Sequence, residues 1–205
     1  MDHEEDDRTF SVVRERIRQI EKKALRALHG TKQRKTAPQG RYRFHPLEAR
    51  HLTLISLWLG RPHVAQWWSD PEKQIEKLRR NLVDQSFEAL IMLLEDRPVG
   101  YLQVYDASPG APGASLDQPP GTRGLDLFIG EGNRLGQGHG PAFVRLITER
   151  RLAGNSVHRV IADPHPDNHR SIRCFEKAGF AREREILRPS GPAVLMVRSR
   201  DRLKK

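Results

Sequence analysis

The sequence predicts one α/β domain of the α+β type, in which a central mixed, mostly antiparallel sheet is flanked by helices. Two observations support this fold class. Apolar runs follow one another closely at 87–95 and 99–106, as expected of an antiparallel hairpin. From residue 124 onward, strands alternate with helices, which is typical of neighbouring parallel strands. An extra N-terminal helix is expected to precede the domain.

The first 40 residues are expected to form a unit of their own, made of a charged amphipathic helix and a basic linker (1–40). Helical spacing predicts the helix at 8–29, with an apolar stripe formed by Phe10, Val13, Ile17, Ile20, Ala24 and Leu28. About three heptads are marginal for a lone coiled coil, so the stripe favours docking on the domain or on a partner. The segment 30–40 contains two glycines and a proline, which is typical of a linker.

The domain is expected to cover residues 41–200 and to begin with a strand and two helices. The segment RYRFHPL (41–47) is typical of a short strand. Residues 48–59 and 71–85 carry apolar side chains at helical spacing. The hairpin then follows, closed by the turn DRP.

A long loop separates the hairpin from the second part of the domain. Residues 107–123 are rich in Gly and Pro, and a loop of this length is more often functional or mobile than structural. The remaining elements are expected to be a strand at 124–130, a helix at 138–152, a strand at 159–164, a helix at 167–178 and two closing strands, ARERE and AVLMVRSR. A basic tail is expected at 201–205.

The formal net charge of +10 is concentrated at the two ends of the chain. Residues 8–41 carry +9 and residues 198–205 carry +4, residues 1–7 contain five acids, and residues 42–197 carry only +2. Basic arms of this kind suit nucleic acid or acidic lipid headgroups. Aromatic residues are not interleaved with the charges, which favours a solvated extension that binds nothing specific.

Composition sets the expected compartment. No apolar run approaches the roughly 20 residues that span a bilayer, and the N-terminus lacks the apolar stretch of a signal peptide. The single cysteine, Cys174, excludes an internal disulfide and a cysteine-rich zinc site. The sequence therefore predicts no membrane span and a cytoplasmic location. It does not indicate an oligomeric state.

The segment LGQGHG (135–140) follows a strand and opens a helix. Its glycines remove side chains where the chain turns, so that backbone N–H groups can converge on an anion at the helix N-terminus. It matches neither a Walker A loop nor a Rossmann fingerprint. A glycine-rich turn without a ligand is the alternative.

Several motifs extend the pattern beyond this loop. A strand, the glycine-rich loop, a second strand and an Asn-led helix ending in FEKAGF together resemble the GNAT acyltransferase superfamily. The segments HVAQWW, PVGYLQVYDA, RGLDLFIG, LGQGHG, DPHPDNHRSIRCFEKAGF and GPAVLMV resemble the aminoglycoside 6'-N-acetyltransferases within it, from about Phe44 to Arg200. The resemblance implies a GNAT fold, acetyl-CoA as the acyl donor, and a small-molecule primary amine, foremost an aminoglycoside, as the acceptor.

The resemblance also implies which residues contact acetyl-CoA. Backbone N–H groups at Phe128, Ile129 and Gly130 are expected to polarise the thioester carbonyl. Asn168 is expected to cap its helix and to flank the pantetheine arm, with Phe175 near the cofactor. The pyrophosphate is expected on the glycine-rich loop, which consists of Leu135, Gly136, Gln137, Gly138, His139 and Gly140.

For the acceptor, the resemblance implies two acids. Asp126 matches an active-site acid that holds the amine and accepts its proton, directly or through water, and a solvated strand residue is the alternative. Asp163 matches an acid that binds a polycationic substrate, and an Asp-Pro turn is the alternative. The other residues expected at the acceptor are Trp67, Trp68, Tyr101, Gln103 and Asp117.

Three departures from the family pattern concern the acceptor and the leaving group. Phe175 stands where many relatives have a Tyr that can protonate the thiolate. Ser190 replaces an Asp, and Asp117 is the one acid of the loop 107–123. Each departure removes a negative charge or a proton donor. One alternative function is a siderophore-type lysine N-acyltransferase, a branch that shares much of this sequence pattern. The other, indicated by Phe175 and the basic arms, is a non-catalytic acyl-CoA-binding module.

No metal site is expected in the histidine-containing segment before the last helix. His165 and His169 lie on either side of Pro166, at the joint between strand and helix, without a partner in place. Cys174 is expected to be a small buried side chain and not a nucleophile.

Overall fold

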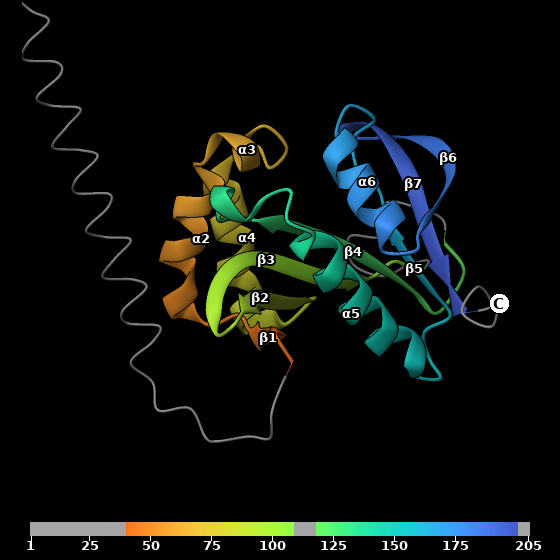
Figure 1. The fold of residues 1–205 in the computed structure, drawn as a ribbon, viewed down its shortest axis with the longest axis horizontal. Helices are drawn as coiled ribbons and strands as arrows, with labels where there is room; N and C mark the ends of the chain where they lie inside the picture. Colours follow the sequence, from red (N-terminus) through yellow and green to blue (C-terminus); the bar gives the residue numbers. More distant parts are fainter. Residues whose placement is uncertain (1–39, 109–117, 201–205) are drawn as a thin grey trace, which may run out of the picture.

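The computed structural model describes residues 40–108 and 118–200 of the 205-residue chain (Figure 1). The predicted N-terminal helix at 8–29, Asp117 and the basic tail at 201–205 lie outside the described residues.

Seven strands form a single sheet in the order β1-β2-β3-β4-β5-β7-β6. All neighbouring pairs are antiparallel except β4 and β5, which are parallel. The strands are β1 Tyr42–Pro46, β2 Glu88–Leu94, β3 Arg97–Asp106, β4 Thr122–Ile129, β5 Arg159–Ala162, β6 Ala181–Arg188 and β7 Gly191–Ser199. The predicted mixed, mostly antiparallel sheet is confirmed.

The sheet opens between β4 and β5. These strands pair only at their beginnings, from Thr122 opposite Arg159 to Gly124 opposite Ile161. Beyond Gly124, β4 continues along β3 as far as Ile129. The carboxyl-terminal half of β4 therefore has a strand neighbour on one side only. Crevices at the carboxyl ends of strands are common ligand sites in α/β sheets.

Helices cover both faces of the sheet. The α-helices are α2 Leu52–Leu59, α3 Pro62–Ala65, α4 Pro71–Asp84, α5 His139–Ala153 and α6 His169–Lys177, with short 3₁₀ turns η1 Ala49–His51 and η2 Gly132–Arg134. Figure 1 shows α2, α3 and α4 grouped at one end of the sheet, and α6 beside β6 and β7 at the other.

The alternation of side chains along β3 explains why the sheet is covered on both sides. Leu102 points into a core formed with α5 and α6, where Phe143 is fully buried. Its neighbour Tyr101 points the opposite way, into a core formed with α2 around the fully buried Trp58. Burying side chains of this size contributes about 1.5–3 kcal/mol each.

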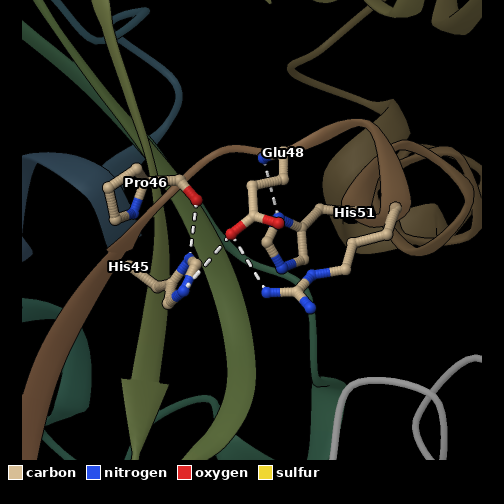
Figure 2. Close-up of polar contacts among 5 residues, drawn as sticks. His45, Pro46, Glu48 and His51 are labelled. Atoms are coloured by element: carbon tan, nitrogen blue, oxygen red, sulfur yellow. Dashed lines mark hydrogen bonds and ion pairs between the residues drawn. The ribbon is translucent and has the colours of Figure 1, made fainter. Parts of the chain in front are cut away.

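A polar cluster around Glu48 fixes the start of α2 (Figure 2). The Glu48 backbone N–H donates to His51 Nδ1 at 2.9 Å, and the Glu48 carboxylate lies 3.5 Å from His45 Nε2. It also accepts a hydrogen bond from Arg50 at 3.0 Å. Burial, reinforced by the nearby charges of His45 and Arg50, lowers the pKa of His51 to about 4. The ring is therefore neutral at pH 7 and stays a hydrogen-bond acceptor in this cap.

Every element predicted within 41–200 is present. β4 begins at Thr122, two residues before the predicted strand at 124–130. The four-residue helix α3 is an addition, because Pro62 starts a turn too short to show a period in the sequence. Within the described residues, no helix is long and apolar enough to cross a membrane.

Candidate active site

A cavity of about 480 Å³ lies where β4 leaves β5, a size typical of small-molecule sites. Its walls come from the end of β4, the glycine-rich loop, the first turns of α6 and the connection between α3 and α4. The predicted site residues that line it are Trp67, Trp68, Phe128, Ile129, Leu135, Gly136, Gly138, His139, Gly140 and Asn168. The structure thus brings the predicted cofactor loop and the Asn-led helix to one cavity.

The glycine-rich loop adopts a backbone conformation that favours glycine. Gly136 and Gly138 have φ values of +74° and +83°. Gly138 is the N-cap of α5 and offers no side chain to the first turn. The first N–H groups of a helix have no partner within the helix, and they point toward its N-terminal end. In this helix that end lies at the cavity, so these N–H groups suit an anionic ligand.

Cationic side chains surround the same cavity. Arg134 follows β4, while Arg170, Arg173 and Lys177 project from α6. Asp167 is the single carboxylate among the residues that line the cavity. Sequence reasoning did not single out these cations. The three on α6 recur at helical spacing, on one face, and that spacing was the available signal.

Asn168 and Cys174 hold α6 in place beside the cavity. The Asn168 side-chain oxygen accepts the Ser171 N–H at 3.0 Å, which confirms the predicted cap. A Cβ on Gly140 would lie 3.0 Å from Cys174 Sγ, so α5 and α6 approach closely at this point. Burial raises the pKa of the Cys174 thiol to about 12, and it is therefore a neutral packing group at pH 7.

Other residues expected at the cofactor have side chains that contact the protein itself. Phe175 is buried and packs on Phe180, with ring centroids 5.2 Å apart. The His139 ring is also buried, with Nδ1 3.1 Å from the Tyr42 hydroxyl. Gln137 does not line the cavity, and its side chain donates to a carbonyl of its own loop. His139 nevertheless lines the cavity, together with Gly138 and Gly140.

The pairing of β4 shows which backbone groups face the opening. The Gly130 N–H donates to the Val99 carbonyl at 2.8 Å, so Gly130 does not supply the donor that the sequence predicted. N–H groups two residues apart in a strand point the same way, and that of Phe128 also faces β3. Leu127 and Ile129 turn their N–H groups toward the opening instead. They are therefore the N–H groups at this end of β4 that a ligand in the opening can reach.

The end of β4 is held by α2 and α3. A Cβ on Gly130 would lie 2.2 Å from the Trp58 ring, so glycine is required there. Trp58 Nε1 donates to the Glu131 carboxylate at 2.9 Å. Arg61 donates to the Gly130 carbonyl at 2.8 Å and to the Glu131 carboxylate at 3.0 Å. This cluster fixes the strand edge that faces the opening.

Asp126 lies just beyond the cavity on the same face of β4 as Phe128. Its carboxylate accepts a hydrogen bond from Gln103 Nε2 at 2.7 Å, and the Tyr101 hydroxyl donates to Gln103 Oε1 at 3.1 Å. Burial raises the pKa of Asp126, while the Gln103 hydrogen bond and the charges of Lys77 and Arg188 oppose the rise. A half-buried carboxylate with a raised pKa is a suitable proton acceptor.

Asp163 is placed differently from its expected role. It follows the end of β5, and its carboxylate forms an ion pair with the Arg188 guanidinium. The side chain of Asp163 is 4% exposed and that of Arg188 is 21% exposed. The carboxylate is therefore covered by a cation of the chain itself.

The two tryptophans wall the cavity in different ways. Trp68 packs edge-on against Tyr101 and Phe128, with ring centroids 6.0 and 5.1 Å away. Trp67 is 38% exposed and lies 5.7 Å from the His165 ring across the cavity mouth. Trp68 is thus largely a core residue, while Trp67 offers an aromatic surface to a ligand.

His63 and His51 both have partners within the protein. His63 lines the cavity, and its Nε2 lies 3.0 Å from the Ile129 carbonyl. His51 lies in the Glu48 cluster, outside the cavity lining. Within residues 40–108 and 118–200, no group of three or more His, Cys, Asp or Glu is arranged to hold a metal ion.

An opened sheet, a glycine-rich loop at a helix N-terminus and a basic cavity fit the GNAT class of acyltransferases that the sequence resembles. The sequence model of the acetyltransferase (GNAT) domain matches residues 48–187, and the chain belongs to this family of acetyltransferases.

Within this family, the chain is similar to several aminoglycoside-modifying or resistance proteins. Aminoglycoside N(6')-acetyltransferase type 1 of Klebsiella pneumoniae is 36% identical over 157 residues, which cover 73% of this chain and 78% of the relative. The kanamycin resistance protein of Rhizobium radiobacter is 43% identical over 81 residues, 40% of this chain and 75% of the relative. The solved structure of AAC(6')-Ib with paromomycin and acetyl-CoA has a TM-score of 0.73 and 30% identity, covering 81% of this chain and 97% of that one.

Proposed function

We propose that this protein transfers the acetyl group of acetyl-CoA to a primary amine, and that the 6'-amine of an aminoglycoside is the first acceptor to test. One observation carries the proposal. The basic cavity, with its anion-binding loop, ends beside a half-buried carboxylate, Asp126. The activities named for the relatives at 30–36% identity support the same reaction.

The residues of the cavity suit acetyl-CoA in charge and shape. The N–H groups at the start of α5 suit its pyrophosphate, and Arg134, Arg170, Arg173 and Lys177 suit its phosphate charges. The groove between β4 and α6, with Asn168 on one side, suits the narrow pantetheine arm. The Ile129 and Leu127 N–H groups lie along the strand edge on which the thioester would rest.

The transfer uses few side chains. Asp126 accepts the proton of the amine, directly or through a water molecule, and the free amine attacks the thioester carbon. The strand N–H groups donate to the carbonyl oxygen as it gains negative charge. The carbon–sulfur bond then breaks, and the amide and the CoA thiolate form. No Tyr lines the described cavity, so the thiolate takes its proton from water or from the nitrogen of the intermediate.

A thiol-release assay with a matched pair of acceptors tests this proposal. The two acceptors are aminoglycosides that differ only in carrying a 6'-amine or a 6'-hydroxyl. We expect CoA release and a gain of one acetyl group, by mass spectrometry, with the amine and not with the hydroxyl. Equal release with both, or release only without an acceptor, would contradict it. Lysine derivatives and polyamines in the same assay test other primary amines.

We also propose a cytoplasmic location, supported by the cysteine content of the chain, a single Cys174. Detection of the full-length chain in the soluble cytoplasmic fraction, and not among secreted proteins, tests it.

A further inference from the structure

Arg188, the last residue of β6, lies at the acceptor end of the site. Its guanidinium forms an ion pair with the Asp163 carboxylate, which is 4% exposed beneath it. It also contacts the Tyr105 hydroxyl, a buried group whose pKa is raised by burial and by the charge of Asp126. One side chain thus joins the ends of β6, β5 and β3.

The register of the sheet places these groups on one face. Gln103 stands opposite Asp126, and Tyr105 stands opposite Gly124, which in turn stands opposite Ile161 on β5. Asp163 is two residues beyond Ile161, so it continues the same face. Asp126 and Asp163 therefore flank one side of the opening.

The β6 strand reaches this face from the far edge of the sheet. Ile186, two residues before Arg188, packs with Tyr105 in a small core around Ile161 and Leu195. Residues two apart in a strand project on the same side, so Arg188 extends over the face that carries Tyr105. Packing of the hairpin thereby fixes the guanidinium beside the acids.

The charges at this end of the site nearly cancel. Asp126 and Asp163 supply two carboxylates, and the cationic side chains of Lys77 and Arg188 both lie near Asp126. An acceptor with several ammonium groups gains most where carboxylates are free to pair with them. Here one carboxylate already has a partner, which such an acceptor must displace.

We propose that Arg188 is a specificity-determining residue that occupies Asp163 as an internal cation and thereby favours acceptors with one ammonium group over acceptors with several. The inference rests on the proposed function in one respect, since it takes the reacting amine to lie at Asp126. It predicts that freeing Asp163 opens a second cation site without changing the first.

The substitution Arg188→Gln tests this, because Gln keeps a polar side chain but loses the charge. Kanamycin serves as the polycationic probe and 6-amino-6-deoxyglucose as the single-amine probe. We expect the KM for kanamycin to fall about 10-fold, which corresponds to about 1.4 kcal/mol, and the KM for the single amine to stay within about 2-fold. Arg188→Lys, which retains the cation, should leave both values close to wild type.

Arg184→Gln is the matched control. Arg184 lies on the same strand, four residues earlier and on the same side, but it is exposed, and the ion pair with Asp163 is formed by Arg188. The Arg184→Gln substitution removes the same formal charge, and it should change neither the KM for kanamycin nor the KM for the single amine. Equal changes in Arg184→Gln and Arg188→Gln would reveal a general charge effect and overturn the proposal. A KM for kanamycin that rises or stays the same in Arg188→Gln would also overturn it.

Calorimetric titration of kanamycin into the CoA-saturated protein separates this inference from the proposed function. Binding needs no acetyl transfer, so tighter binding to Arg188→Gln supports the role of Arg188 even if aminoglycosides are not acetylated. Absence of tighter binding overturns it whatever the enzyme acetylates. The melting temperature of each variant, measured alongside, must stay close to wild type for the comparison to hold.

Discussion

The two ends of the cleft differ in the groups that they present to the proposed ligands. The proposed cofactor end presents backbone N–H groups of a glycine-rich loop and side chains such as Arg173 and Lys177 that line an open cavity. The proposed acceptor end presents Asp126 and Asp163, which are held by hydrogen bonds and ion pairs of the chain itself. The first end depends on local sequence, and the second depends on how distant strands meet.

This difference sets which substitutions affect chemistry and which affect binding. Backbone recognition of a polyanion tolerates changes of side chain, because the donors remain. A carboxylate that exchanges a proton in the reaction cannot be replaced by another side chain without loss of that function. The largest effects on rate are therefore expected at the acceptor end, and graded effects on affinity at the cofactor end.

The largest effect is expected from Asp126→Asn, which keeps the shape of the side chain and loses the proton acceptor. We expect kcat to fall about 10²–10⁴-fold, the usual contribution of a general base, while the Kd of acetyl-CoA stays within about 2-fold. Steady-state kinetics and calorimetry measure the two quantities. Asp84→Asn, on the exposed end of α4, is the control. A wild-type kcat in Asp126→Asn would remove this residue from the chemistry.

The next effect is expected from Gly138→Asp, which places a carboxylate at the N-terminus of α5. Like charges a few Å apart cost on the order of 2–4 kcal/mol at a protein surface, so acetyl-CoA should bind at least about 30-fold more weakly. The stabilisation of the protein by acetyl-CoA should disappear from melting curves. Gly154→Asp adds the same charge at the other end of the same helix, and this variant should still be stabilised by acetyl-CoA. If acetyl-CoA raised the melting temperature of Gly138→Asp as much as that of the wild type, the loop would not be part of the cofactor site.

A smaller effect is expected from Arg173→Gln, which removes one of four cations around the cavity. Because one charge-assisted contact contributes about 1.5–3 kcal/mol before screening by salt, the Kd of acetyl-CoA should rise about 10-fold at low salt and less at high salt. Titrations at two salt concentrations measure both. Arg80→Gln, an exposed position on α4, should have no effect. A salt-independent change would point to altered packing of α6.

The smallest effect is expected from deletion of residues 1–40. The family match begins at residue 48 and the first strand at Tyr42, so kcat/KM should stay within about 2-fold. Circular dichroism confirms that the shortened chain is folded. A collapse of turnover in a folded protein would make the N-terminal segment part of the site, and the predicted domain boundary would be wrong.

Local patterns accounted for most of the fold and for the cofactor end. The spacing of apolar residues predicted each strand and helix of 41–200 except α3, which is too short to show a period. The glycines of LGQGHG predicted the turn before α5, because positive φ at Gly136 and Gly138 is a local requirement. The Asn168 cap was likewise predictable from its own helix.

The acceptor end was less accessible to sequence reasoning. Arg188 contacts Asp163 because β6 lies at the edge of the sheet, next to β7. The order of strands in a sheet cannot be predicted from the residue types of one strand. The donors at Leu127 and Ile129 depend on which side of β4 is paired, which only the register reveals. The inward position of Phe175 follows from packing of α6 on the core.

The most direct test of the account is the pH dependence of kcat/KM in the wild type and in Asp126→Asn. Burial raises the pKa of Asp126, and the carboxylate accepts a proton only above that pKa, so the wild-type rate should fall as pH drops through it. Without this base, Asp126→Asn can use only an acceptor that is already a free amine, so its rate should rise as the pH approaches the pKa of that amine. We therefore expect Asp126→Asn to lose the lower limb of the wild-type profile. An identical profile in the two proteins would contradict it.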